Sequence, residues 1–110
     1  MEPNRKPTQD EQKLLELLIS KATNLHLSPR WRDDLLVRLM KDGEMGSFQL
    51  FPNGVVDENR LFGEMVSEYD FVDADGVKVI VSLNLDKAGE LFEVDVWKTD
   101  FSPLIKMPDD

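Results

Sequence analysis

The segment VKVIVSLNL, residues 77–85, decides the fold predicted for this chain. Each of its odd-numbered residues is aliphatic, which is typical of a strand with one face against a core. The segments 61–71 and 91–97 show the same period of two, and each is joined to 77–85 by a turn that starts with Asp and ends with Gly. Such turns suit hairpins, because the glycine readily adopts a positive φ. The three segments therefore predict consecutive antiparallel strands.

Strand register can be predicted at the first turn, residues 73–76. Pairing Asp73 with Val77 closes a three-residue loop, so that two aromatic residues oppose two valines in the next strand. The expected pairs are Phe71 with Val79 and Tyr69 with Val81. Met65 is expected on the same side as Tyr69 and Phe71.

The second turn, residues 86–89, leaves two registers open. A three-residue loop places Glu93 and Asp95 on the face of the valines, whereas a loop one residue longer pairs apolar residues with each other. A one-residue slip exchanges the faces of a strand, so we expect the apolar pattern to prevail over the turn preference. The longer loop places Leu83 opposite Phe92, Val81 opposite Val94 and Val79 opposite Val96.

The N-terminal half predicts a helix and two shorter elements. TQDE, residues 8–11, is a capping box, and the leucine spacing after it predicts a helix over 9–24 with Asn24 near its C-terminal cap. Residues 29–41 fit either a helix or a strand, and we expect a helical turn over 29–33 followed by a strand over 35–41. The Asp42-Gly43 pair then predicts a hairpin to a short strand over 48–51. Residues 52–60 are expected to form a polar loop.

These elements predict a single α+β domain over residues 1–110, in which the N-terminal helix packs on an antiparallel sheet of four to five strands. Residues 1–7 are expected to be a flexible lead-in and 107–110 a frayed tail. The predicted core residues come from the strands and from the apolar stripe of the helix. They are Val79, Val81, Leu83, Val94, Val96, Phe92, Tyr69, Phe71, Leu14, Leu18 and Leu25.

Composition excludes several classes of site. The chain has no cysteine, which rules out disulfides, thiolate nucleophiles and Cys-ligated zinc. The lone histidine, His26, lies between two leucines after the helix and fits a packing or capping role better than catalysis. We therefore expect no cofactor and no metal site. No secretory or membrane-spanning segment is evident, which makes a cytoplasmic location the expectation.

Charge is divided unevenly along the chain. Residues 1–41 hold eight Lys/Arg and six Asp/Glu, or 8 − 6 = +2, whereas residues 42–110 hold five and sixteen, or 5 − 16 = −11. The acidic part is also the part with strand periodicity, so an acidic sheet surface is expected. Such a surface favours a basic protein partner and disfavours nucleic acid and anionic membranes. The carboxylates of the turns, Asp73, Asp75 and Asp86 among them, are expected mainly to maintain solubility.

With the longer second loop, two carboxylates and a tryptophan share the face opposite the valines. An aromatic side chain within charged groups is the usual composition of a binding hot spot. The predicted partner-binding residues are Glu93, Asp95, Trp97, Asp100 and Lys78. Two carboxylates on one strand face could also act as an acid/base pair, but no nucleophile or base accompanies them, so we expect no catalytic residue.

Three stretches resemble a family of small bacterial proteins of unknown function: DGEMGS (42–47), DADGV (73–77) and LFEVDVWKTDFSPL (91–104). The resemblance implies no activity. Proteins of this size and acidity are often immunity proteins encoded beside toxins, so an immunity role is suggested by analogy with that class of protein. The leading hypothesis is therefore a non-enzymatic protein-binding module, possibly an immunity protein that neutralises a basic bacterial toxin. The alternatives are an oligomeric structural or regulatory protein and, last, a small carboxylate-based enzyme.

Overall fold

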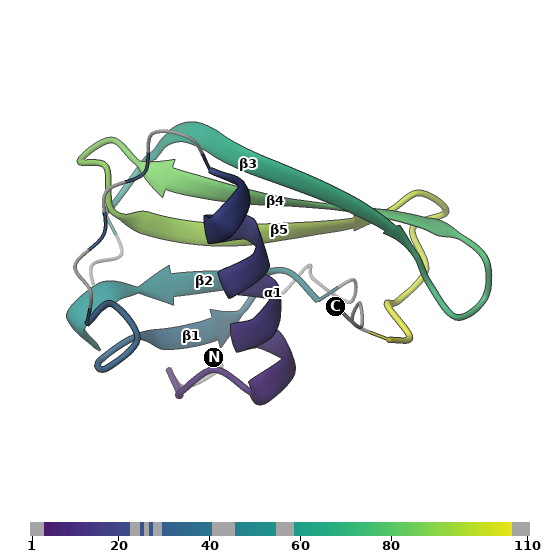
Figure 1. Cartoon of the computed structure of the whole chain (residues 1–110), viewed down its shortest axis with the longest axis horizontal. Coiled ribbons are helices and arrows are strands. Elements are labelled where there is room, and N and C mark those ends of the chain that lie inside the picture. Colours follow the sequence, from purple (N-terminus) through teal and green to yellow (C-terminus); the bar gives the residue numbers. More distant parts are fainter. Residues whose placement is uncertain are drawn as a thin grey trace.

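A computed structural model describes residues 4–22, 25, 27, 30–40, 46–54 and 59–106. Within them the chain forms one helix packed on one face of a five-stranded antiparallel sheet with the strand order β1-β2-β5-β4-β3 (Figure 1). The predicted α+β fold is confirmed. The elements are α1 (Gln9–Lys21), β1 (Leu36–Leu39), β2 (Phe48–Phe51), a 3-10 turn (Pro52–Gly54), β3 (Phe62–Val72), β4 (Lys78–Asp86) and β5 (Leu91–Lys98).

Helix α1 starts at the predicted capping box. Thr8 Oγ1 accepts a hydrogen bond from Glu11 N at 3.1 Å, and Glu11 Oε1 accepts one from Thr8 N at 2.9 Å. The helix ends at Lys21, earlier than expected, because Ala22 has extended backbone dihedrals and serves as the C-cap. Asn24, the expected cap, lies outside the described residues.

The sequence of residues 29–41 fits either a helix or a strand. Its described part forms a turn over residues 30–34 and then strand β1 at Leu36–Leu39, within the strand expected over 35–41. β1 pairs with β2, and the Asp42-Gly43 turn expected between them lies outside the described residues. The N-terminal segment runs along the free edge of β1, where Arg5 and Val37 exchange backbone hydrogen bonds of 2.9 and 2.7 Å. The Arg5 guanidinium also binds Glu11 at 2.7 and 2.9 Å. These contacts join the N-terminal segment to both β1 and α1.

The β3–β4 register confirms the prediction at the first turn, since Tyr69 pairs with Val81 and Phe71 with Val79. Met65 is the exception, because an irregularity between Met65 and Ser67 leaves Val66 as an extra residue. A bulge of this kind moves the residues beyond it to the other face. Met65 is therefore 51% exposed instead of lying with Tyr69 and Phe71.

The expected four-residue loop between β4 and β5 is wrong. Asp86 N donates to Glu90 O at 2.9 Å, which closes a three-residue loop. A bulge then follows, because Leu85 pairs with Leu91 while Asn84 pairs with Glu93, and Phe92 is the extra residue. The bulge brings apolar residues opposite each other again, but the three expected pairs are wrong by two residues. Leu83 lies opposite Val94, Val81 opposite Val96 and Val79 opposite Lys98. Turn preference and apolar pattern are thus both satisfied.

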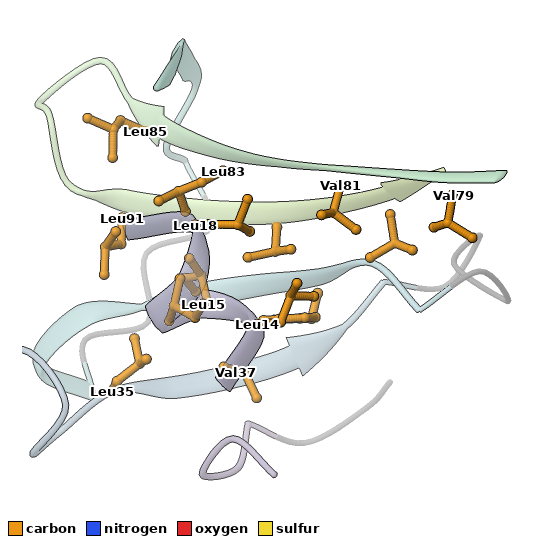
Figure 2. Packing of buried hydrophobic residues seen from close by; sticks show 14 residues of the cluster. Leu14, Leu15, Leu18, Leu35, Val37, Val79, Val81, Leu83, Leu85 and Leu91 are labelled. Carbon is orange, nitrogen blue, oxygen red and sulfur yellow. The ribbon is translucent and has the colours of Figure 1, made fainter. Parts of the chain in front are cut away.

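The core lies between α1 and the sheet (Figure 2). Most predicted core residues are buried, and Leu25, Tyr69 and Phe71 pack against the cluster while partly exposed. Phe92 was wrongly assigned to the core, since the bulge gives its place to Leu91. The buried cluster comprises Leu14, Leu15, Leu18, Leu35, Val37, Phe48, Leu50, Val79, Val81, Leu83, Leu85, Leu91, Val94 and Val96.

Candidate interaction surface

The sheet face opposite α1 carries the candidate site, and no described helix or strand covers it (Figure 1). We call its central part the outer face. It consists of side chains that alternate with core residues along three adjacent strands, and of an aromatic residue after β5. These are Glu68, Asp70, Val72, Lys78, Ile80, Ser82, Glu93, Asp95, Trp97 and Phe101.

Strand register arranges part of this face in two rows across the sheet. In one row Ser82 lies between Glu68 and Asp95. Because adjacent strands lie about 4.8 Å apart, these two carboxylates are about 10 Å from each other. In the other row Ile80 lies between Asp70 and Trp97. Apolar and acidic groups are therefore interleaved on one flat surface.

Four of the five predicted partner-binding residues lie on the outer face: Lys78, Glu93, Asp95 and Trp97. The side chains of the two carboxylates on β5 are oriented by neutral neighbours. Glu93 Oε1 accepts a hydrogen bond from Asn84 Nδ2 at 3.0 Å, and Asp95 Oδ1 lies 3.2 Å from the Ser47 hydroxyl. Lys78 Nζ lies 3.3 Å from Asp70 Oδ2, and both side chains are more than half exposed.

Asp100, the fifth predicted residue, lies in the turn after β5 and stabilises that turn. Its Oδ1 accepts hydrogen bonds from Ser102 N at 3.0 Å and from Ser102 Oγ at 2.6 Å. These bonds lower the pKa of the Asp100 carboxyl. The ionised carboxylate therefore holds the backbone beside Phe101.

An exposed aromatic pair stands at one end of the outer face. Trp97 is 48% exposed and Phe101 72% exposed, and their ring centroids are 6.2 Å apart at an interplanar angle of 36°. Phe101 has a φ of 65°, a left-handed conformation that bulky residues rarely adopt. Such strain persists only where the surroundings impose it. The sequence KTDFS, residues 98–102, gives no signal for it, because the position holds Phe instead of the Gly that a positive φ usually requires.

A buried ion cluster holds the segment that follows this turn, on the opposite side of the sheet. Lys98 follows Trp97, so it points toward the core face, where its side chain is fully buried. Its Nζ lies 2.9 Å from Asp73 Oδ2 and 2.6 Å from Asp75 Oδ2, and it donates to Pro103 O at 3.2 Å. We call these groups the Lys98 cluster. They attach the segment after β5 to the β3–β4 turn.

The ionisation of the cluster follows from its hydrogen bonds. Burial alone raises the pKa of Asp73, but Lys98 and the backbone N–H groups of Ile105, Ala74 and Lys106 outweigh it and hold that pKa far below its ordinary value. Burial likewise lowers the pKa of Lys98, and the two aspartates more than reverse that effect. Asp73 was expected to be a solvated turn residue, which is wrong. The signal was Lys98 itself, the lone cation on the apolar side of β5.

A second cation, Arg60, is largely buried and connects β2 to β5. Its guanidinium lies 5.4 Å from the ring centroid of Phe51 and 5.1 Å from that of Phe92, and it donates to the carbonyls of Leu50 and Leu91. It also lies 3.3 Å from Asp86, a buried turn aspartate that was likewise expected to be solvated. Arg60 borders a shallow depression of about 230 Å³, but its contacts with these protein groups assign it a structural role.

Other kinds of site receive no support from the part of the chain described here. Among these residues no group of three His, Cys, Asp or Glu is placed to hold a metal ion. His26 lies outside them. In the same residues, no helix is both long enough and apolar enough to cross a membrane.

Comparison with known proteins identifies a family whose function is unknown. No curated protein and no solved structure matches the chain. A family described as Domain of unknown function (DUF6984) matches residues 4–108, nearly the whole chain. The chain therefore belongs to this family of unknown function.

Proposed function

We propose that this chain is a non-enzymatic protein-binding module whose outer face binds a basic protein partner. One observation carries the proposal: Trp97 and Phe101 are exposed beside the carboxylates of a sheet face that no described element covers. Large aromatic side chains surrounded by polar groups are the usual centre of a protein interface. Contiguous exposed apolar patches with a polar rim are typical of protein interaction sites.

The charge of the surface supports a basic partner. Within the outer face Glu68, Asp70, Glu93 and Asp95 accompany one cation, Lys78. Lys78 already lies against Asp70, so the remaining carboxylates dominate the field. Complementary charge accelerates association and makes it sensitive to salt. It also opposes binding to nucleic acid or to an anionic membrane.

The finer form of the proposal is an immunity protein that neutralises a basic bacterial toxin in the cytoplasm. Its support is the excess of carboxylates in residues 42–110 and the resemblance to small bacterial proteins. In this role Asp95 and its neighbours pair with Lys or Arg at the toxin's substrate site. A catalytic role has less support. Glu93 contacts an amide, and the Ser47 hydroxyl beside Asp95 is buried and hydrogen-bonded to the Val96 backbone.

Capture from native lysate at low salt tests the interface. The tagged wild-type chain is compared with Trp97→Ala, with Asp95→Lys and with Glu90→Lys, a matched charge reversal in the exposed second turn. We expect one captured protein to be lost with the first two variants and kept with the third. In a titration of that protein, Trp97→Ala should weaken binding about 30-fold, equivalent to about 2 kcal/mol. Captured proteins that do not differ among the four baits would refute the surface.

Two further measurements separate the alternatives. If the captured protein is a toxin, its expression should arrest growth, and the wild-type chain should restore growth better than Trp97→Ala. If the captured protein is not toxic, the chain would still be a protein-binding module, but the immunity role would be refuted. Sedimentation of the chain alone tests the oligomeric alternative, which a mass that stays monomeric over a wide concentration range would eliminate.

A further inference from the structure

The free edge of β3 is a second feature of the acidic surface. β3 lies at the end of the sheet, and no described strand pairs with its outer side. Irregularities at Gly63 and Val66 interrupt the first part of the strand, which discourages pairing there. The stretch from Ser67 to Val72 is regular. The opposite edge of the sheet differs, since Arg5 pairs with Val37 in β1.

The backbone groups that face this edge follow from the hydrogen-bond alternation. Asp73 N donates to Val77 O, and in an antiparallel pair every second residue points its N–H and C=O at the partner strand. Phe71 and Tyr69 therefore bond to β4. Three residues between and beside them point their N–H and C=O outward: Glu68, Asp70 and Val72. The hydrogen bond from Thr99 N to Lys78 O confirms this assignment. It shows that the backbone groups of Lys78 point to β5, so Val72, which is paired with Lys78, has no backbone bond to β4 and points its own groups outward.

The side chains along this edge specify what fits. Glu68, Asp70 and Val72 are exposed on the outer face. On the core face Tyr69 and Phe71 are stacked at 6.2 Å and only partly buried, because the sheet ends beside them. An added strand would therefore meet two carboxylates on one side and two aromatic rings on the other.

We propose that the β3 edge binds an extended segment of the basic partner by strand addition. The segment carries Lys or Arg at alternate positions, opposite Glu68 and Asp70, and apolar residues between them over Tyr69 and Phe71. This inference rests on the proposed function and names the part of the partner that β3 recognises. The backbone of β3 supplies the hydrogen bonds, and its carboxylates select the charge.

A second copy of the chain fits the edge less well than a basic segment does. If two β3 strands paired antiparallel through their outward groups, Glu68 and Asp70 of both copies would come together on one face. Like charges opposite each other destabilise a strand pair. Lys78 does not relieve this, since it already lies against Asp70. Charge complementarity thus favours a different chain.

The test uses an octapeptide of alternating lysine and valine with the full-length protein. By titration at low salt, we expect N-methylation of the lysine amides to weaken binding at least tenfold, because the amides opposite Glu68 and Asp70 face β3 when the segment pairs antiparallel to it. Methylation of the valine amides, which face away, should change the affinity less than threefold. Equal effects of the two methylated peptides would show charge attraction alone and overturn the proposal.

The protein side of the contact has its own controls. The peptide should slow amide exchange at Glu68, Asp70 and Val72, and an unchanged rate there would contradict strand addition. Glu68→Pro removes one outward N–H without touching the bonds to β4, whereas Glu68→Thr removes the charge and keeps the N–H. We expect the proline variant to bind at least fivefold more weakly than the threonine variant. Equal affinities, or a concentration-dependent dimer that Glu68→Pro abolishes, would overturn the assigned occupant.

The two proposals fail separately. If capture of the partner does not depend on Trp97, the role of the aromatic pair is refuted, and the peptide experiment still tests the β3 edge. If the two methylated peptides bind equally, strand addition at the β3 edge is refuted, and the role of Trp97 in partner binding still stands.

Discussion

Two Asp-to-Gly turns flank β4, and their backbones are nearly the same. Asp73 N donates to Val77 O at 2.9 Å, and Asp86 N donates to Glu90 O at 2.9 Å. The closing glycines have φ values of 83° and 85°. Both aspartates are buried, unlike the other charged residues of these turns. The local sequence thus produces the same turn twice.

The turns differ in what their aspartates bind. Asp73 meets Lys98 at 2.9 Å and accepts backbone hydrogen bonds from Ile105 and Lys106, so the first turn is fastened to a distant segment. Asp86 Oδ1 accepts from the N–H groups of Ala88 and Glu90 within its own turn, and its cation is Arg60 at 3.3 Å. The comparison teaches that turn geometry is local information, whereas the role of the turn aspartate depends on tertiary contacts.

The largest expected effect breaks the first turn's distant attachment. Lys98→Met leaves Asp73 buried without its cation, which is more costly than removing both charges. We expect the Tm to fall by about 10 °C or more. Adding Asp73→Asn to Lys98→Met should recover part of the loss. Thermal unfolding followed by circular dichroism measures both, and amide exchange at Ile105 and Lys106 reports release of the C-terminal segment.

The matched change at the second turn is Arg60→Met. It should lower the Tm less than Lys98→Met, because the Arg60–Asp86 pair is longer, at 3.3 Å against 2.9 Å, and less completely buried than the Lys98–Asp73 pair. If Arg60→Met is the more damaging of the two, the contrast between a distant and a local attachment is wrong.

A close backbone contact distinguishes the second turn. A Cβ added at Gly63 would overlap the Asp86 carbonyl, whereas one added at Gly76 in the first turn meets nothing within 4 Å. Gly63→Ala forces β3 away from the turn, and overpacking of this kind costs about 2 kcal/mol. Urea unfolding of Gly63→Ala beside Gly76→Ala measures the difference. Because Gly76→Ala itself loses stability through its positive φ, a loss at Gly63 no larger than the loss at Gly76 would contradict the expected cost of the overlap.

Much of the fold could be predicted because it depends on local patterns. The capping box at Thr8 and the alternation of Val79, Val81 and Leu83 specify the helix start and the central strand. The register at Asp73 followed from the same patterns. What escaped prediction were the bulges at Val66 and Phe92, because a single extra residue is favoured only when the neighbouring strand is already in place.

The candidate site, like the fold, could be predicted only where local sequence patterns determine it. Alternation correctly assigned Trp97 and Asp95 to one face. The loop length assumed for that assignment was wrong, and the bulge at Phe92 is what places both residues on the outer face. The strained backbone of Phe101 and the free edge of β3 could not be predicted. The first lies in a turn beside the tertiary contacts of Lys98, and the second depends on which strand ends the sheet.

Acid pH should weaken the first turn through Asp73. A carboxyl whose pKa is lower when folded contributes stability that is complete above its ordinary pKa of about 4 and is lost as the pH falls through the folded value. Wild type should therefore lose stability from pH 5 downward, and Asp73→Asn should lose less over that range. Glu11, whose pKa is lowered despite its burial, mainly by Arg5, contributes in the same direction in both proteins. Urea midpoints at several pH values measure the slopes, and parallel slopes would contradict the role of Asp73.

The smallest expected effect tests the likeness of the two turns. Gly76 and Gly89 have nearly equal positive φ values, and an added Cβ meets nothing within 4 Å at either. The cost of Gly76→Ala and of Gly89→Ala is therefore conformational alone, about 1 kcal/mol in each case. Equal shifts in the urea midpoint would show that distant attachment by Lys98 leaves the turn's own backbone energy unchanged. A clearly larger loss at Gly76 would mean that the Lys98 cluster transmits strain into the turn, and that local and tertiary contributions are not separable there.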